Sequence, residues 1–279
     1  RIIVRLGATK VRLTGGEPLV RNNVNDLVSM LSSVEGVDDL TMTTNGYLLP
    51  QKIADLKSAG LRRLTISLDT LDEEIFRRMN GRNFGTQKVL EGIESAERAG
   101  YRPLKINSVV QRGVNDHTIV DLARHFKDRG HIVRFIEYMD VGTRNGWKLD
   151  HVVSADEIAA TIDAELPLVP VAPNYRGEVA LRYRYRDGAG EIGIIASVTQ
   201  PFCGDCTRLR LSPEGRIYTC LFATIGADLR GPLRAGADDA EMESRIRGAW
   251  AVRDDRYSAE RASMTEPRRE KVEMYHIGG

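Results

Sequence analysis

A regular alternation of β-branched runs and amphipathic segments, between about residues 11 and 140, constrains the fold of this chain most. The segments between the β-branched runs space their apolar residues three and four apart, which is typical of helices that cover a sheet. The five predicted strands are Val11–Thr14, Leu40–Thr44, Arg63–Leu68, Leu104–Val110 and Ile132–Tyr138. Repeated βα units form mostly parallel sheets with right-handed connections. The sequence therefore predicts an α/β fold, either an open sheet or an incomplete barrel.

The pattern changes after Asp140. Ser154 is suited to cap a helix that runs to about Ala164. Three prolines, at 167, 170 and 173, indicate an irregular connection, and residues 258–279 show no clear periodicity. The other elements predicted in this half are a hairpin over Val179–Tyr185 and Glu191–Ser197, and a helix near Glu241–Trp250.

Composition excludes several classes of protein. The 279 residues carry a formal net charge of +1, so the chain lacks the basic excess of an electrostatic nucleic-acid binder. No apolar run is long enough to cross a membrane, and no signal peptide is visible. We therefore expect a cytoplasmic protein with no nucleic-acid or membrane partner. The abrupt start at Arg1, in place of Met, leads us to expect a fragment.

All three cysteines of the chain lie in one short stretch. Cys203 and Cys206 form a C-x-x-C motif, and Cys220 follows a predicted hairpin whose turn is Ser212–Gly215. A hairpin of this length returns Cys220 close to the C-x-x-C, so we expect three thiolates to converge on one point. Such spacing is typical of a metal site in a reducing compartment.

The residues alone leave the kind of metal open. Structural zinc usually takes four protein ligands, and His276 is the one distal candidate for a fourth. A four-iron cluster on three cysteines leaves one iron open, as a catalytic site requires. Soft ligands suit both metals, and three unrelated thiols are the remaining alternative.

Arg208 and Arg210 lie within the same stretch, two positions apart on a predicted strand, so both point to one face. Guanidinium groups beside a metal centre suit a phosphate chain, which accepts paired hydrogen bonds. A solvated strand face is the more common setting of such a pair. The neighbouring cysteines are what favour the phosphate interpretation.

Candidate binding residues gather at or near the ends of the predicted strands, where parallel α/β folds place their sites. Gly15 and Gly16 follow the first strand, and adjacent glycines let the backbone approach a ligand closely. The next side chain, the Glu17 carboxylate, is suited to bind an amine. The further candidates are Arg12, Thr43, Ser67, Lys105 and Met139. Each of them alone has an ordinary structural explanation, and only their grouping on one rim points to a site.

The motifs are similar to those of a known family. T-G-G-E-P after the first strand resembles the glycine-rich motif with which radical S-adenosylmethionine enzymes hold the methionine amino group. The further motifs are T-T-N-G, S-L-D-T-L-D, R-F-I-E-Y-M-D-V-G, N-G-W, F-C-G-D-C-T-R-L-R-L and the terminal Gly-Gly. Together they resemble the GTP 3′,8-cyclases of molybdenum cofactor biosynthesis, the MoaA proteins, over the whole chain.

The resemblance implies a fold and a reaction. The fold is an incomplete (βα) barrel of the radical SAM type, with five of the family's six strands present here, and a C-terminal α+β extension. We expect residues 1–140 to form the partial barrel and residues 141–279 the extension. The implied lyase reaction converts GTP to (8S)-3′,8-cyclo-7,8-dihydroguanosine 5′-triphosphate, the first step of molybdopterin biosynthesis. One [4Fe–4S] cluster cleaves S-adenosylmethionine to a radical that takes the ribose 3′ hydrogen, and a second cluster binds the guanine.

By motif match the resemblance also implies residue roles. Cys203, Cys206 and Cys220 would hold the second cluster. The implied contacts are Arg12, Thr43, Lys105, Arg208 and Arg210 with GTP, and Gly16, Glu17, Ser67 and Met139 with S-adenosylmethionine. The terminal Gly278-Gly279 is expected to enter the active site. The implied partners are an external electron donor, the next enzyme of the pathway (cyclic pyranopterin monophosphate synthase) and a second copy of the chain.

One departure from the family is large. The family's first cluster rests on a C-x-x-x-C-x-x-C motif, which is absent from these 279 residues. Truncation and a natural variant without radical chemistry would each explain the departure, and we expect the chain as given to be inactive. The alternative functions are another radical SAM enzyme with an auxiliary cluster, and a zinc- or cluster-stapled nucleotide-binding protein without catalysis.

Overall fold

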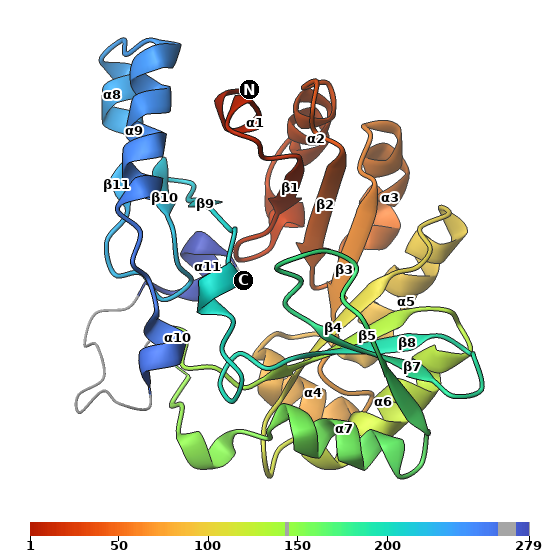
Figure 1. Cartoon of the computed structure of the whole chain (residues 1–279). Coiled ribbons are helices and arrows are strands. Elements are labelled where there is room, and N and C mark those ends of the chain that lie inside the picture. The colour runs from red at the N-terminus through yellow and green to blue at the C-terminus, as the bar shows by residue number, and fades with distance from the viewer. Residues whose placement is uncertain (143–144, 262–271, 279) are drawn as a thin grey trace.

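A single eight-stranded sheet forms the centre of the computed structural model, which describes residues 1–142, 145–261 and 272–278 (Figure 1). The strand order is β1-β2-β3-β4-β5-β8-β7-β6. The strands are β1 (Lys10–Leu13), β2 (Asp39–Thr44), β3 (Arg63–Ser67), β4 (Lys105–Val110), β5 (Ile132–Glu137), β6 (Leu168–Val171), β7 (Leu181–Tyr185) and β8 (Glu191–Ile195). β1 to β5 pair in parallel, which confirms the predicted α/β class, and β8 continues in parallel beside β5.

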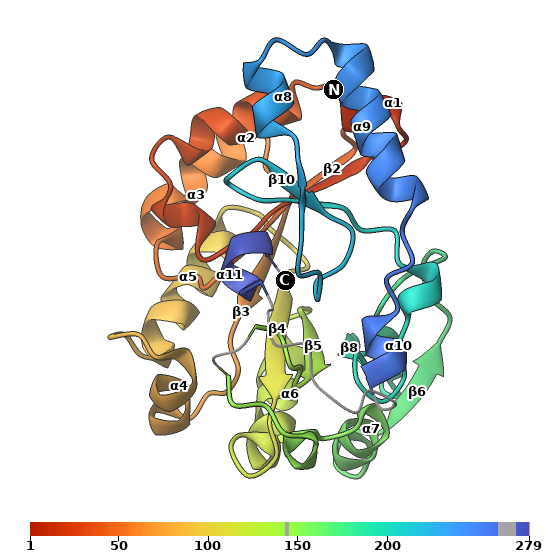
Figure 2. The ribbon, with the colours of Figure 1, turned by 90° about the vertical axis from the view of Figure 1, so that its left-hand side faces the viewer.

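Helices cover the outer face of this curved sheet (Figures 1 and 2). They are α2 (Val24–Ser32), α3 (Leu49–Ser58), α4 (Glu73–Asn80), α5 (Thr86–Arg98), α6 (Ile119–Lys127) and α7 (Ala155–Asp163). α6 shows why they form, because Ile119, Leu122, Ala123 and Phe126 fall on one face and are all buried. Ser154 caps α7 in a reciprocal capping box with Glu157, as the sequence predicted for this position.

The inner face of the sheet is polar. On β4 buried residues alternate with half-buried ones, so Lys105 and Asn107 point away from the helices. The register of the parallel strands sets Asn107 beside Arg134 of β5 and Thr65 of β3 beside Lys105. The concave side therefore collects polar side chains from several strands.

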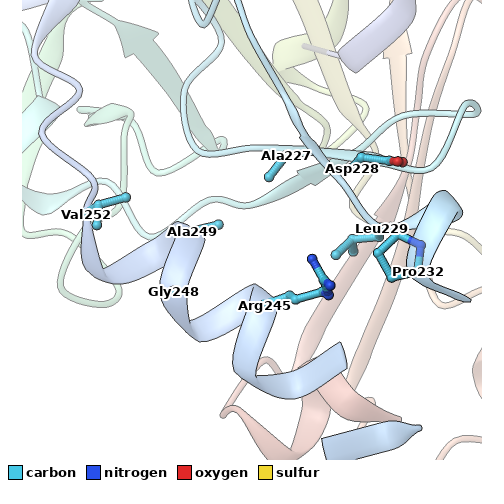
Figure 3. Close-up of a pocket in the computed structure, with 8 residues that line it drawn as sticks. All are labelled: Ala227, Asp228, Leu229, Pro232, Arg245, Gly248, Ala249 and Val252. Carbon is cyan, nitrogen blue, oxygen red and sulfur yellow. The ribbon is translucent and has the colours of Figure 1, made fainter. Parts of the chain in front are cut away.

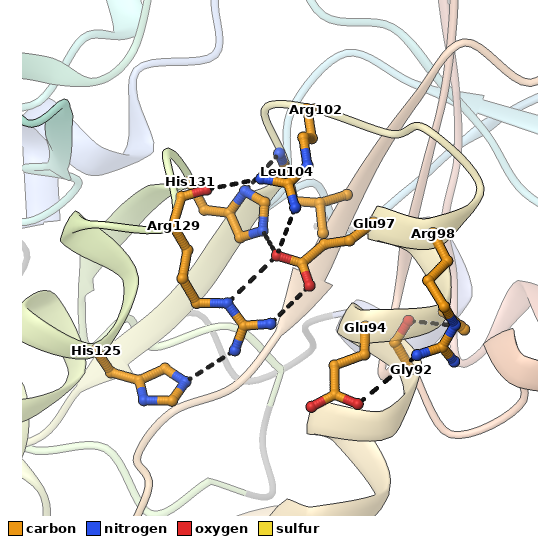
Figure 4. Close-up of polar contacts among 10 residues, drawn as sticks. Gly92, Glu94, Glu97, Arg98, Arg102, Leu104, His125, Arg129 and His131 are labelled. Carbon is orange, nitrogen blue, oxygen red and sulfur yellow. Dashed lines mark hydrogen bonds and ion pairs between the residues drawn. The ribbon is translucent and has the colours of Figure 1, made fainter.

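Charged side chains fix the amino ends of β4 and β5, opposite the predicted site (Figure 4). The carboxylate of Glu97, on α5, accepts hydrogen bonds from Arg129 at 2.6 and 3.3 Å and lies 2.7 Å from Nε2 of the buried His131. Arg102 pairs with the same carboxylate at 3.6 Å. One carboxylate thus holds the segments that lead into both strands.

The proline-marked region was predicted to be irregular, and this prediction is wrong. Residues 168–171 form β6, the edge strand, which pairs antiparallel with β7. Pro170 lies opposite Tyr183. An edge strand tolerates a proline because one side of it needs no ladder hydrogen bonds.

A second, three-stranded sheet lies beside the first and carries the cysteine hairpin. Its strands are β9 (Arg210–Leu211), β10 (Arg216–Tyr218) and β11 (Ala227–Asp228). The later helices are α8 (Arg230–Arg234), α9 (Asp239–Ala251), α10 (Tyr257–Glu260) and α11 (Met274–Ile277), and the 3₁₀ turns are η1 (Pro18–Val20), η2 (Asp116–Thr118), η3 (Leu149–His151) and η4 (Cys203–Asp205). α9 confirms the helix predicted near Glu241–Trp250. α10 and α11 are one-turn helices, too short to show the periodicity that prediction needs.

The start of the chain packs against this C-terminal part. Ile2 and Leu6, at either end of α1 (Ile2–Arg5), contact a small core that includes Ile217 of β10 and Met242 of α9. Arg5 donates to the Asp239 carboxylate at 3.1 Å. Figures 1 and 2 show α1 beside α9, so the cysteine hairpin is anchored to the β1 edge of the large sheet. Among the described residues, no helix is long and apolar enough to span a bilayer.

Candidate active site

Cationic side chains from separate strands meet inside the large sheet. Arg12 on β1 donates from Nη1 to the Thr43 hydroxyl at 3.3 Å. Burial, and then the nearby charge of Arg63, lower the pKa of Arg12. Burial, and then the charge of Arg134, lower the pKa of Lys105 to about 8. These cations are poorly hydrated and repel one another, so an anion bound among them would be stabilised.

Arg134 is the buried member of this group that sequence reasoning missed. It is 8% exposed, and its Nε donates to Asn107 Oδ1 at 2.9 Å. Burial, and then the charge of Arg12, lower the pKa of Arg134 to about 10. The sequence did contain a signal for this residue. Arg134 lies inside the apolar run I-V-R-F-I, and on a strand it shares a face with Ile136.

The loop between β6 and β7 supplies an acidic counterpart. The charge of Glu178 raises the pKa values of Lys105 and Arg134, against the larger effect of burial. Its Oε2 accepts a hydrogen bond from the Asn174 backbone at 2.6 Å. On the same loop, the Tyr175 ring lies 4.8 Å from Nζ of Lys10 on β1. The loop thus reaches from the far edge of the sheet back to its first strand.

In the cysteine hairpin, one arginine side chain donates hydrogen bonds to a cysteine sulfur. Arg208 donates from Nε and Nη2 to Sγ of Cys206, at 3.3 and 3.1 Å. Burial alone would raise the pKa of Cys206, but the charge and hydrogen bonds of Arg208 outweigh it and lower the pKa. Burial raises the pKa of Cys220, whose sulfur accepts a hydrogen bond from the Phe222 backbone at 3.4 Å. The hairpin therefore favours the thiolate that a metal requires at Cys206.

Among the described residues, the three thiolates do not form a site for a single metal ion. No group of three or more His, Cys, Asp or Glu side chains in the described part of the chain could hold a single metal ion. In the hairpin, Tyr218 pairs with Arg210 and the ladder stops there, before it reaches Cys206. His276, the candidate fourth ligand, lies 3.5 Å from the Glu214 carboxylate.

The donor set nevertheless fits an iron–sulfur cluster. Each thiolate of such a cluster binds a different iron, so the sulfurs need not surround one point. Three soft donors come from one hairpin, and the charge of Arg208 favours the thiolate at Cys206. The charges of Cys206 and Cys220 both act on Arg210 and raise its pKa, against the larger effects of burial and Arg208.

Arg210 links the hairpin to the C-terminal tail. Burial, and then the charge of Arg208, lower the pKa of Arg210 to about 10. Its Nε donates to the carbonyl oxygen of Gly278 at 3.3 Å. Gly278 is buried, and a Cβ built on it would stand 2.2 Å from Cγ2 of Thr14, directly after β1. The tail residue therefore lies between the hairpin and the carboxyl end of β1, while Gly279 falls outside the described residues.

The residues predicted for S-adenosylmethionine lie along the carboxyl ends of the strands. Gly16 is exposed after β1, and Ser67 is the last residue of β3. Met139 follows β5 and packs against the cluster that contains Val141 and Phe222. These positions share one rim, as the sequence predicted for the ends of parallel strands.

Glu17 also has a structural role on this rim. Its Oε1 accepts hydrogen bonds from the Leu19 backbone at 3.0 Å and the Thr44 hydroxyl at 2.7 Å. Its Oε2 accepts from the Asn45 backbone at 2.7 Å. The carboxylate thus holds the loop after β1 against the end of β2. An amine bound at Glu17 would share oxygens that already accept protein hydrogen bonds.

A pocket of about 470 Å³ lies elsewhere, between α9 and the segment from β11 to α8 (Figure 3). Its polar side chains already interact with nearby residues of the same segments. Asp228 accepts from the backbone at Arg230 and Gly231, and Arg245 pairs with Glu241. None of the predicted site residues lines this pocket. It lacks the convergent polar groups of a catalytic site.

Two family profiles cover most of the chain. The Radical SAM superfamily matches residues 1–126, and Molybdenum Cofactor Synthesis C matches residues 131–259. The two matches follow each other along the sequence with a short gap.

Curated relatives match over nearly the whole chain. A protein named GTP 3′,8-cyclase from Xanthomonas axonopodis pv. citri is 51% identical over 280 aligned residues, which span 100% of this chain and 83% of the relative. Proteins of the same name are 48% identical in Acidothermus cellulolyticus and 45% identical in Staphylococcus carnosus, with 83% of each relative covered.

Proposed function

The chain belongs to the GTP 3′,8-cyclase family, and we propose that it serves the cyclisation of GTP by S-adenosylmethionine radical chemistry, the first step of molybdenum cofactor biosynthesis. The observation that carries the proposal is the cationic interior. Arg12, Lys105 and Arg208 come from three distant segments; the charge of Arg208 acts on Arg12, and the charge of Arg12 acts on Lys105. A nucleoside triphosphate is the anion that such a group suits.

In this proposal five residues hold GTP. Arg208 and Arg210 grip the triphosphate from the hairpin, and Lys105 adds a charge from β4. Arg12 and Thr43, already joined by a hydrogen bond, orient the substrate from β1 and β2. Because these groups are only partly exposed, their hydrogen bonds to phosphate face less competition from water than on an open surface.

Cys203, Cys206 and Cys220 would hold one [4Fe–4S] cluster, which, when bound, supplies an iron with an open position for the guanine. Arg208 supports the assignment, because its hydrogen bonds to Cys206 stabilise a thiolate. The residues present do not fit the family's first cluster, whose cysteine motif is absent from these 279 residues. We therefore assign no step to that cluster here.

Gly16, Glu17, Ser67 and Met139 would contact S-adenosylmethionine along the rim. Oε2 of Glu17 accepts one protein hydrogen bond, which leaves capacity for the methionine amine. We further propose that residues 1–140 act as the partial barrel and residues 141–279 as the extension with the cluster and GTP residues. An electron donor, the next enzyme of the pathway and a second copy of the chain stay predictions.

The tail completes the proposed site. Gly278 lies between Arg210 and Thr14, which supports the prediction that the terminal glycines enter the active site. A residue with a side chain at position 278 would meet Thr14, so the tail needs its glycine to take this path.

Anaerobic reconstitution followed by calorimetry tests the proposal. We expect iron and sulfide in the protein, and GTP binding that is much tighter than guanosine binding. Equal affinity for GTP and guanosine would contradict the cationic site.

The second candidate function is nucleotide binding without catalysis, on a zinc- or cluster-stapled hairpin. The C-x-x-C spacing of Cys203 and Cys206, which suits zinc as well as a cluster, is the observation that favours it. Stoichiometric zinc without sulfide, with GTP still bound, would select this function.

A further inference from the structure

The segment after α9 runs beside the cysteine hairpin and contacts it at two points. Arg253 donates from Nη1 to the carbonyl oxygen of Cys206. Asp255 accepts a hydrogen bond through Oδ2 from the hydroxyl of Thr219, the residue directly before Cys220. Nε of Arg253 and Oδ2 of Asp255 form an ion pair at 3.9 Å. A continuous polar chain therefore joins the backbone at Cys206 to the neighbour of Cys220.

The strand pairing of the hairpin does not by itself hold Cys206 in place relative to Cys220. Its backbone ladder pairs Tyr218 with Arg210 and Ile217 with Leu211, and it ends there. In the described part of the chain, no ladder hydrogen bond reaches Cys206, so strand pairing alone does not fix its separation from Cys220. The chain through Arg253 and Asp255 spans this interval.

Both charged side chains are well shielded from water. The side chains of Arg253 and Asp255 are 15% and 20% exposed. The Arg253 guanidinium also lies 4.9 Å from the Trp250 ring, which restrains it. Charges in such a setting act on their neighbours over several ångströms.

We propose that Arg253 and Asp255 are positioning residues for the metal group on the hairpin: they set the separation of Cys206 and Cys220, and their charges tune the reduction potential of the bound cluster. The proposal rests on the cluster assigned above to the three cysteines. Outer groups that orient metal ligands are as much a part of a site as the ligands themselves. Nearby charges and hydrogen bonds are among the factors that set the potential of an iron–sulfur cluster.

The two charges have opposite effects on the potential. A cluster gains negative charge when it is reduced, so Asp255 opposes reduction and Arg253 favours it. Asp255→Asn should therefore raise the midpoint potential, and Arg253→Gln should lower it. Arg253→Lys keeps the charge and should return the potential toward that of the wild-type protein. If Arg253 and Asp255 had only a structural role, the midpoint potentials of Asp255→Asn and Arg253→Gln would shift in the same direction, or would not shift.

A redox titration of the reconstituted full chain, followed by electron paramagnetic resonance, measures these shifts. The matched control is the exposed pair of Arg245 and Glu241 on α9, at 2.8 Å, whose variants Arg245→Gln and Glu241→Gln should leave the potential unchanged. Equal potentials in wild type, Asp255→Asn and Arg253→Gln would overturn the tuning role.

A second experiment needs no metal. In the metal-free chain with Cys203→Ser, a fluorogenic dithiol-bridging bimane reagent can join only Cys206 and Cys220. Thr219→Val removes one hydroxyl at nearly constant volume, and we expect it to slow bridging several-fold, as Asp255→Asn should. Unchanged bridging rates in both variants would overturn the positioning role. If bridging slows while the wild-type protein takes up no iron and sulfide, the positioning role stands and the cluster assignment fails.

Discussion

Arg210 and Gly278 meet across 68 residues of sequence, with Nε of the arginine 3.3 Å from the carbonyl oxygen of the glycine. The contact joins the hairpin that carries the cysteines to the end of the chain, beside the carboxyl end of β1. Figures 1 and 2 show α11, which leads into Gly278, beside this hairpin. The arginine proposed to bind phosphate is thus also the residue that holds the tail.

Substitution of Gly278 should release the tail. Gly278 has φ +69°, and a Cβ there would stand 2.2 Å from Thr14 Cγ2. We expect Gly278→Ala to speed hydrogen exchange in residues 272–278 several-fold. The control is Gly248→Ala on α9, where a Cβ meets nothing within 4 Å and should stabilise the chain by roughly 0.5–1 kcal/mol. Unchanged exchange in Gly278→Ala would contradict the docked tail.

Appending one alanine after Gly279 tests the role of the tail in the reaction. The experiment uses a longer version of the chain that includes the family's first cluster motif. We expect cyclisation of GTP to be abolished or sharply reduced, while GTP binding stays intact, because the tail organises chemistry more than it holds substrate. Unchanged turnover would refute this role.

Loss of Arg210 should weaken GTP binding. A charge-assisted hydrogen bond contributes about 1.5–3 kcal/mol, so Arg210→Ala should reduce affinity by about one to two decades. The control is Arg234→Ala on the exposed surface of α8, which should leave affinity unchanged. Calorimetry measures both. Equal affinities for wild type and Arg210→Ala would disprove the contact.

The affinity for GTP should fall as the pH rises through about 8. Burial and the charge of Arg134 lower the pKa of Lys105 to about 8, so this side chain is charged below that pH and neutral above it. The wild-type protein should therefore bind GTP more weakly at pH 9 than at pH 7, by about a decade or less. Lys105→Met should bind weakly at both pH values. A wild-type affinity that does not vary between these pH values would show that Lys105 makes no contact with GTP.

Replacement of Cys220 should remove the metal group. The reconstituted chain should carry about four irons, the content of one such cluster, and Cys220→Ala should lose most of them. Iron and sulfide analysis after anaerobic gel filtration gives the result. Full retention of iron in Cys220→Ala would remove this cysteine from the ligand set.

Acid should destabilise the chain through the network around Glu97 (Figure 4). Burial alone would raise the pKa of Glu97, but hydrogen bonds from Arg129 and His131 outweigh it and lower the pKa. Burial lowers the pKa of His131. At both sites the unfolded chain takes up protons before the folded one, so stability is present at neutral pH. It falls as the pH drops below about 6.5, where an unfolded histidine protonates, and falls further toward the lowered pKa of Glu97.

Urea denaturation of Glu97→Gln checks this network. A hydrogen bond to a charged group contributes about 1.5–3 kcal/mol, so loss of the Glu97 charge from this partly buried network should destabilise the variant by about that amount at pH 7. Its stability should also depend less on pH between 7 and 5. The control is His117→Gln, at an exposed position on η2, which should unfold as the wild type does. A Glu97→Gln variant as stable as the wild type would show that the network contributes little.

Much of the large sheet could be predicted because its signals are local. Each of β2 to β5 contains several β-branched residues, and helical segments with regular apolar spacing separate the strands. The turn at Ser212–Gly215, with the extended residues on either side of it, likewise predicted a hairpin, which β9 and β10 form. The family motifs are local as well, since each is a short run of adjacent residues, and they were enough to name the candidate site residues.

Contacts between distant segments could not be predicted in this way. The pairing of β8 with β5, the position of Arg134 among the inner cations, and the link from Arg253 to Cys206 each join segments that no local pattern connects. The position of Cys206 relative to Cys220 likewise depends on contacts beyond the end of the β9–β10 ladder, which the local pattern does not specify. Periodicity and turn chemistry act over a few neighbouring residues and so specify elements, whereas register, burial and charge contacts arise only once the elements pack, and they decide which side chains share a site.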